Sequence, residues 1–196
     1  MTTPLYPTFK KRVHDAVDQL IKKQVTPWAF FNSGHPFRIQ AFDNRPISYG
    51  STGGFESAPH QVFWSRYIEP FLEDLCLTEI KAAIEMAQHR GVDGKLVLSE
   101  LRDLLSAGCL RVYKRMADID RRLRGRGFPD KVQIRPIDRE LAVMNEFIDE
   151  HINAELEMWK PTPQPSVLFK RLSFWQWFIG IVIAAIGVIA TILVSG

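Results

Sequence analysis

The feature that most constrains this chain is an apolar run near its C-terminus. No Asp, Glu, Lys or Arg occurs from Leu172 to Val194. A helix needs about 20 consecutive apolar residues to cross the hydrocarbon layer of a bilayer. The run is hydrophobic on every face and longer than a core helix requires. We therefore expect residues 172–194 to form a single transmembrane helix.

The residues at the start of this run predict how the helix is oriented. Lys170 and Arg171 lie immediately before it, and positive charges beside a membrane helix favour the cytoplasmic side. Trp175 and Trp177 follow, and tryptophan rings favour the headgroup level. Residues 1–23 contain no apolar run long enough for a signal peptide. We therefore expect a single-pass, tail-anchored membrane protein with a cytoplasmic N-terminal domain.

Small residues within the same run fall on one side of the expected helix. They are spaced by four, three and four positions: Gly180, Ala184, Gly187 and Thr191. Such a seam lets two helix backbones approach closely in lipid. The seam predicts a homo-oligomer or a protein partner bound through the transmembrane helix. The alternative is that Gly and Ala are simply common in such helices.

The residues before this helix are numerous enough for one compact domain. The spacing of apolar residues predicts a mainly helical domain over residues 1–160. Pro161, Pro163 and Pro165 then alternate before the two cations, which predicts a stiff, Pro-rich basic linker over residues 161–171.

Four stretches with apolar residues at helical spacing predict the helices of the domain. They are residues 9–25, 59–90, 96–124 and 138–159. Thr8 is expected to cap the first helix, and Pro70 to break or kink the second. Residues 28–54 are aromatic and turn-rich, which predicts two or three short antiparallel strands or, alternatively, an aromatic-rich loop. The expected fold class is mainly α, with a small strand-containing N-terminal region and one C-terminal transmembrane helix.

Composition argues against two classes of protein. The formal net charge of +3 is too small to indicate a nucleic-acid-binding protein by itself. Only two cysteines occur, Cys76 and Cys109, which is not the pattern of a disulfide framework. We expect both to be small, buried core residues.

A cluster of positive charges begins in the last turn of the third expected helix and continues beyond it. It comprises Arg121, Arg122, Arg124, Arg126, Lys131 and Arg135. These cations could contact anionic lipid, bind nucleic-acid phosphates, or pair with the acidic helix that follows, residues 138–157. Aromatic residues that would stack on bases are nearly absent from the cluster, which argues against nucleic acid. Pairing with the acidic helix is favoured slightly over lipid.

One turn matches half of a calcium-binding helix–loop–helix. Asp93, Gly94 and Glu100 stand at positions that such a loop uses. His89 and Gly91 occupy two places where calcium needs oxygen ligands, so no calcium site is expected. We expect instead a corner between helices in which Gly94 adopts a left-handed conformation.

No pattern of residues indicates a particular enzymatic reaction. The histidines lack zinc-binding spacing, and we expect no metal or cofactor. The main hypothesis is a membrane-anchored interaction or regulatory protein, with the lipid bilayer and a protein as partners. One alternative is a membrane-tethered enzyme whose site lies within residues 28–60, where polar groups concentrate: His35, Asp43, Arg45, Ser51 and His60. A second alternative is a membrane-active effector that oligomerises through its transmembrane helix.

The expected anchor makes a direct prediction. Deleting residues 172–196 removes the apolar run, so the protein should move from the membrane fraction to the soluble fraction of a cell lysate. Carbonate extraction followed by immunoblotting measures the distribution. A truncated protein that stays in the carbonate-resistant pellet would show that another segment holds the chain to the membrane.

Overall fold

The computed structural model describes residues 2–32, 35–40, 46–49, 58–126 and 132–159, all within one compact unit, Met1–Lys160. No helix among these residues is both long and apolar enough to cross a membrane. The expected linker, the transmembrane helix with its flanking residues and the small-residue seam lie outside the described residues.

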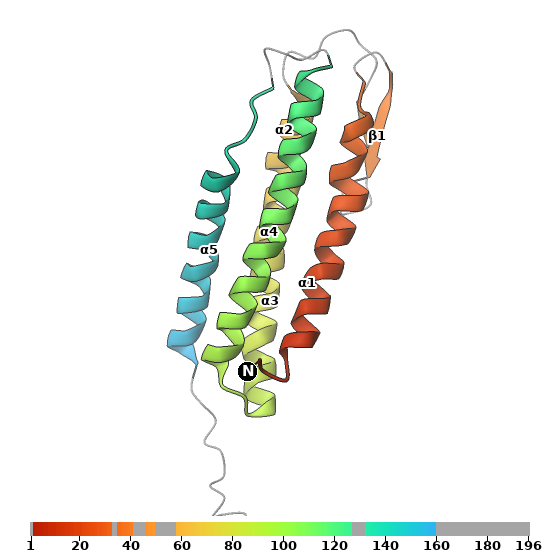
Figure 1. The fold of residues 1–196 in the computed structure, drawn as a ribbon. Helices are drawn as coiled ribbons and strands as arrows, with labels where there is room; N and C mark the ends of the chain where they lie inside the picture. The colour runs from red at the N-terminus through yellow and green to blue at the C-terminus, as the bar shows by residue number, and fades with distance from the viewer. Residues whose placement is uncertain (1, 33–34, 41–45, 50–57, 127–131, 160–196) are drawn as a thin grey trace, which may run out of the picture. The chain divides into compact units, whose positions relative to one another are not determined.

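Four long helices run alternately up and down and form a bundle (Figure 1). They are α1 (Tyr6–Leu20), α3 (Glu69–Arg90), α4 (Gly94–Arg124) and α5 (Ile137–Met158). A short helix, α2 (Pro59–Phe63), precedes α3. The strands β1 (Phe37–Gln40) and β2 (Pro46–Tyr49) form an antiparallel pair. The prediction of a mainly helical domain with a small strand-containing region is confirmed.

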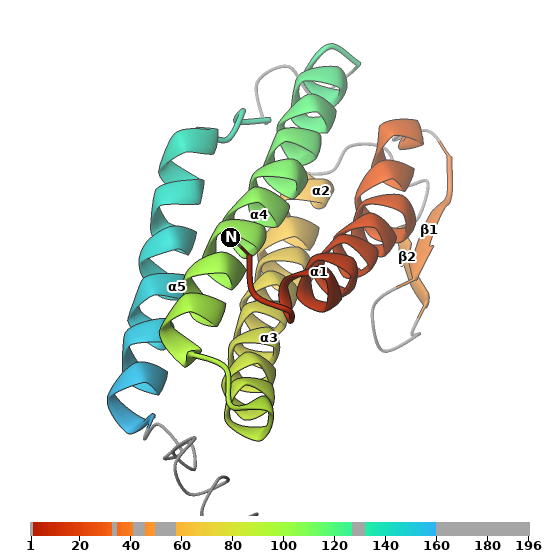
Figure 2. The same ribbon diagram turned by 60° about the horizontal axis from the view of Figure 1, so that its bottom comes forward.

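Helix α4 is the centre of the bundle, because it packs against α1, α3 and α5 (Figure 2). Its buried residues form one wide apolar face that runs the length of the helix, and Leu101, Leu104 and Leu105 lie on that face. The opposite face is exposed at Asp103, Ala107 and Lys114, so the neighbouring helices cover one side of α4.

Helix α1 approaches α4 most closely at a glycine. A Cβ atom placed on Gly108 would lie 3.1 Å from Val17 Cγ2 and 3.3 Å from Val13 Cγ1. Both valines are fully buried and stiff about χ1, so they have little room to move. A side chain at Gly108 would therefore push the two helices apart.

The first and second helices differ in detail from the prediction. Helix α1 begins after Leu5, which stands where Thr8 was expected as the cap. The chain continues past Leu20 through a π-helical segment, η1 (Ile21–Val25), and a 3₁₀ segment, η2 (Thr26–Phe30). Pro27 does not end the helical path. It lies in the first turn of the 3₁₀ helix, where a backbone N–H would have no acceptor within the helix, so the proline costs no hydrogen bond.

Pro70 does not break the helical path, and a π-helical segment, η3 (Trp64–Ile68), ends just before α3 and joins it to α2. Pro70 itself is the second residue of α3. A proline is tolerated there because the N–H groups of a first helical turn have no intrahelical acceptor.

The corner between α3 and α4 uses a different glycine from the one predicted. Gly91 has a φ of 64° and caps α3 in the left-handed conformation, whereas Gly94 is the first residue of α4. The Asp93 carboxylate accepts a hydrogen bond from the Lys95 N–H at 2.9 Å, so it serves as the N-cap of α4. Gly94 is constrained by packing, since an added Cβ would lie 3.0 Å from Trp159 Cε2.

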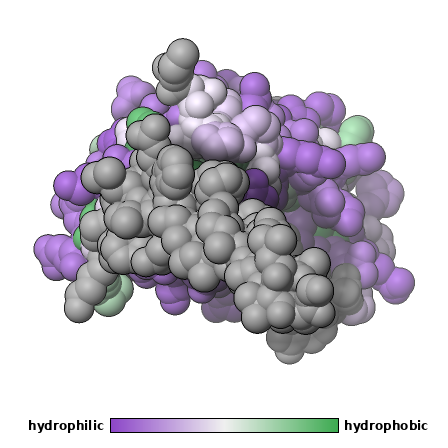
Figure 3. Space-filling view, turned by 90° about the horizontal axis from the view of Figure 1, so that it is seen from below, coloured by the Kyte–Doolittle hydropathy of each residue, from purple (hydrophilic) through white to green (hydrophobic). Residues whose placement is uncertain are grey.

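Trp159, the last described residue, thus lies beside the start of α4. We call this end of the bundle the α4 N-terminal end, and the opposite end, where Arg124 lies, the α4 C-terminal end. Figure 3 views the molecule from the α4 N-terminal end, and the described residues visible there are mostly hydrophilic.

The close approach at Gly108 makes a prediction about stability. We expect Gly108→Val to lower the free energy of unfolding by about 1–3 kcal/mol, because the new side chain overlaps Val13 and Val17. Thermal unfolding of the full chain in a mild detergent, followed by circular dichroism, measures the change. Gly125→Ala is the control, since the nearest atom to an added Cβ there is the Arg122 carbonyl oxygen at 3.6 Å. Similar melting temperatures for both variants would contradict the tight contact between α1 and α4.

Candidate functional site

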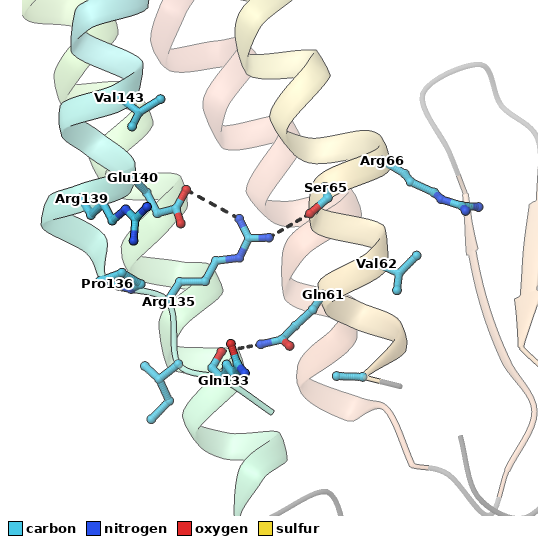
Figure 4. A pocket seen from close by; sticks show the side chains of 12 residues that line it. Gln61, Val62, Ser65, Arg66, Gln133, Arg135, Pro136, Arg139, Glu140 and Val143 are labelled. Carbon is cyan, nitrogen blue, oxygen red and sulfur yellow. Dashed lines mark hydrogen bonds and ion pairs between the residues drawn. The ribbon is translucent and has the colours of Figure 1, made fainter. Parts of the chain in front are cut away.

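An open groove lies between the α2–η3 segment and the start of α5 (Figure 4). Its volume is about 950 Å³. Two separate segments line it: Ala58, Gln61, Val62, Ser65 and Arg66 on one side, and residues 133–136 with Arg139, Glu140 and Val143 on the other. We call this the α2–α5 groove.

The two sides of the groove are held together by polar contacts near its middle. Arg135 forms ion pairs with Glu69 and, at 3.9 Å, with Glu140, and it donates a hydrogen bond to Ser65 Oγ at 3.0 Å. The Gln61 side-chain amide donates to the Gln133 carbonyl oxygen. Because the Arg135 side chain is only 17% exposed, its cation maintains the groove and is not offered to solvent.

The rim of the groove carries exposed aliphatic side chains together with cations. Val62 is 40% exposed and Val143 is 61% exposed. Figure 4 shows Arg66 and Val62 on the α2 side, and Arg139 and Val143 on the α5 side. Among the described residues, neither of these two arginines forms an ion pair. The groove can therefore take apolar side chains between two sites for negative charge.

Beneath α2 lies a polar cluster that is closed to solvent. Asp120 Oδ1 lies 3.1 Å from His60 Nε2 and accepts a hydrogen bond from the Trp64 indole N–H at 3.2 Å. The side chains of His60 and Asp120 are both 0% exposed. A histidine beside an aspartate is a common acid–base pair, but a substrate cannot reach this one. We assign the pair to the attachment of α2 to α4.

An aromatic cluster surrounds this polar pair and attaches the strands. The Trp28 ring is fully buried, and its centroid lies 4.8 Å from that of Phe37 in β1 and 5.2 Å from that of Tyr49 in β2. It also contacts Phe63 at 5.4 Å. Burial, followed by the neighbouring Tyr67, raises the pKa of Tyr49. Trp28 therefore joins the strand pair to the helices.

The enzyme site expected within residues 28–60 is only partly described. Asp43, Arg45 and Ser51 lie outside the described residues. His35 is exposed whereas His60 is fully buried, so these two do not line a common cavity. No group of three or more His, Cys, Asp or Glu in the described part of the chain is placed to hold a metal ion.

The predicted basic loop is distributed over different parts of the structure. Arg121, Arg122 and Arg124 belong to the last turn of α4, where cations interact favourably with the helix dipole. Arg126 follows that helix, and Lys131 lies outside the described residues. Arg135, as shown above, belongs to the groove. The six cations therefore do not form one loop.

The acidic helix pairs mainly with another part of α4. Asp149 of α5 accepts two hydrogen bonds from the Arg102 guanidinium, at 2.6 and 2.8 Å. These bonds hold the pKa of Asp149 below its ordinary value. Among the described cations of the basic cluster, Arg135 forms an ion pair with α5, and its partner there is Glu140.

Cys76 of α3 and Cys109 of α4 are both buried and unpaired by any disulfide. A hydrogen bond between the two thiols, followed by burial, raises the pKa of Cys76. The prediction that both are small core residues is confirmed.

Comparison with protein-family models, with curated proteins and with solved structures gives no significant match to this chain.

Sequence reasoning did not find the groove or the buried polar pair. His60 and Trp64 are four residues apart, and Gln61 and Ser65 share the same spacing. This spacing places the two pairs on different sides of one helical segment, which is a detectable signal. Nothing in the sequence indicated that Asp120 would oppose His60, because 60 residues separate them.

The buried pair makes a prediction about stability. His60→Phe leaves the Asp120 carboxyl with Trp64 alone, so we expect a loss of about 3 kcal/mol in the free energy of unfolding. The double variant His60→Phe with Asp120→Leu should lose less free energy of unfolding than the two single variants lose in sum, because no buried carboxyl remains unpaired. Denaturant unfolding in detergent, monitored by circular dichroism, measures all three. Strictly additive losses would show that the two residues do not interact.

Proposed function

We propose that this chain is a membrane-anchored interaction protein that binds a short segment of a partner protein in the α2–α5 groove. The observation that carries the proposal is the groove itself, with exposed valines between two flanking arginines. The apolar run of residues 172–194, read as a transmembrane helix, would hold the groove beside a membrane.

The chemistry of the groove supports a particular kind of partner segment. Val62 and Val143 lose contact with water when apolar side chains of a partner cover them, which favours association. Arg66 and Arg139 can each donate hydrogen bonds to a carboxylate of the same segment. We therefore propose a partner segment with two or three apolar residues flanked by Asp or Glu. Binding of an amphipathic segment in a groove between helices is a recurring mode of recognition.

The site offers less support for an enzyme. Its polar groups nearest to one another, Arg135, Glu69 and Glu140, are already paired. The acid–base pair that exists, His60 and Asp120, is enclosed by the core. An effector that oligomerises through Gly180, Ala184, Gly187 and Thr191 stays a prediction from the sequence.

Selection from a peptide library tests the proposed partner chemistry. The purified full chain in detergent is used to select from a displayed library of random peptides. We expect the selected peptides to contain apolar residues at helical spacing with Asp or Glu on both sides. Arg66→Glu with Arg139→Glu should weaken binding of these peptides by at least about tenfold, because two attractive contacts become repulsive.

The matched control reverses the charge of two exposed side chains at the α4 N-terminal end, with Arg90→Glu and Lys95→Glu. It should leave peptide binding unchanged. Thermal unfolding verifies that each variant is folded. Two results would overturn the proposal: selection of peptides without acidic residues, or equal weakening by the groove variant and the control.

A further inference from the structure

The α4 C-terminal end carries the most exposed large hydrophobic side chain among the described residues. This is Phe30, the last residue of η2, and its side chain is 73% exposed. Its neighbours Ala29 and Phe31 are 3% and 2% exposed, and Trp28 is fully buried. The backbone is therefore fixed by burial on both sides of Phe30, which holds this ring in solvent.

One cation lies over the exposed ring, and others are exposed on the neighbouring segments. The Arg122 guanidinium lies 5.8 Å from the centroid of the Phe30 ring. Arg124 and Arg126 are exposed on the same end of α4. Lys22 and Lys23 are exposed on η1, which packs against α4. We call Phe30 with these five cations the Phe30 patch.

The described acidic side chains near this patch already have partners. Asp118 pairs with Arg121 at 2.5 Å, and Asp18 pairs with Arg111. Asp120 is buried beside His60. The cations of the Phe30 patch are therefore left with an excess of positive charge that attracts an anionic partner.

An exposed aromatic ring among cations matches the surface of an anionic bilayer. The ring enters the boundary between headgroups and acyl chains, while the cations contact the lipid phosphates. Single-stranded nucleic acid would instead need several aromatic platforms along a basic track. Phe30 is the single strongly exposed aromatic ring at this end among the described residues. We propose that the Phe30 patch binds the surface of a bilayer that contains anionic lipid.

The patch lies far from the place where the described chain ends. Helix α5 has 22 residues and runs from the α4 C-terminal end to Trp159 at the other end (Figure 1). At the helical rise this corresponds to about 33 Å. The patch is therefore separate from the end of the described chain, and it does not overlap with the α2–α5 groove residues.

Capture of vesicles tests the proposal with the full chain. The protein is placed in nanodiscs of phosphatidylcholine and immobilised, and fluorescent vesicles are passed over it. Vesicles of phosphatidylcholine with phosphatidylserine should be captured, whereas vesicles of phosphatidylcholine alone should not. Capture should fall steeply with rising salt, because exposed charges are screened over about 10 Å at 0.1 M. If the chain does not enter nanodiscs, the detergent-free chain is immobilised directly. A failure of membrane anchoring is then distinguished from a failure of the patch to capture vesicles.

Two variants locate the contact. Phe30→Ser, and Arg122→Gln with Arg124→Gln and Arg126→Gln, should each reduce capture by about tenfold or more. The matched controls at the α4 N-terminal end are Leu96→Ser, and Lys81→Gln with Arg90→Gln and Lys95→Gln. Circular dichroism verifies that all variants retain their helices.

Three outcomes would overturn the proposal. The wild-type chain could capture no anionic vesicles at low salt. The patch variants and the controls could reduce capture equally. A single-stranded oligonucleotide could bind the patch while vesicles do not, which would assign the cations to nucleic acid.

Discussion

The structure depends on the burial of α4 along its whole length. This helix of 31 residues buries one wide face along its length, and α1, α3 and α5 pack against it. The contact with α1 is close enough to require a glycine at position 108. Both surfaces to which we assign binding are positioned by this helix. Its C-terminal end carries Arg122, Arg124 and Arg126, and α2 is attached to it through Asp120.

The short segment α2–η3 links the interior to the proposed binding groove. One side of it carries His60 and Trp64 to the buried Asp120, and the other side carries Gln61, Val62 and Ser65 to the groove. The buried polar contacts fix the rotation of this segment about its axis. Since that rotation decides which residues face solvent, the core and the groove are not independent features. A buried polar contact used in this way provides orientation more than stability.

The long helices were predictable because their apolar residues recur over many turns. The predicted limits of the third helix, 96 and 124, differ from those of α4 by two residues at most. Features set by contacts between distant residues were not predictable. Gly91, which ends α3, has the left-handed conformation, whereas Gly94 begins α4 and packs beside Trp159. The basic cluster was treated as one group, although Arg121, Arg122 and Arg124 lie on α4 and Arg135 is held in the groove by Glu69 and Glu140.

We propose that one helical bundle presents two binding surfaces, the α2–α5 groove and the Phe30 patch, on a chain that the apolar run of residues 172–194 would hold at a membrane. Hydroxyl-radical footprinting of the chain in the native membranes of cells that express it, compared with the purified chain in neutral nanodiscs, tests this most directly. The account predicts that Val62, Val143 and Phe30 are oxidised less in native membranes. Leu96 and Met158, which are 46% and 67% exposed, should be oxidised equally in both samples. Equal oxidation of all five residues, or protection confined to Leu96 and Met158, would contradict the account.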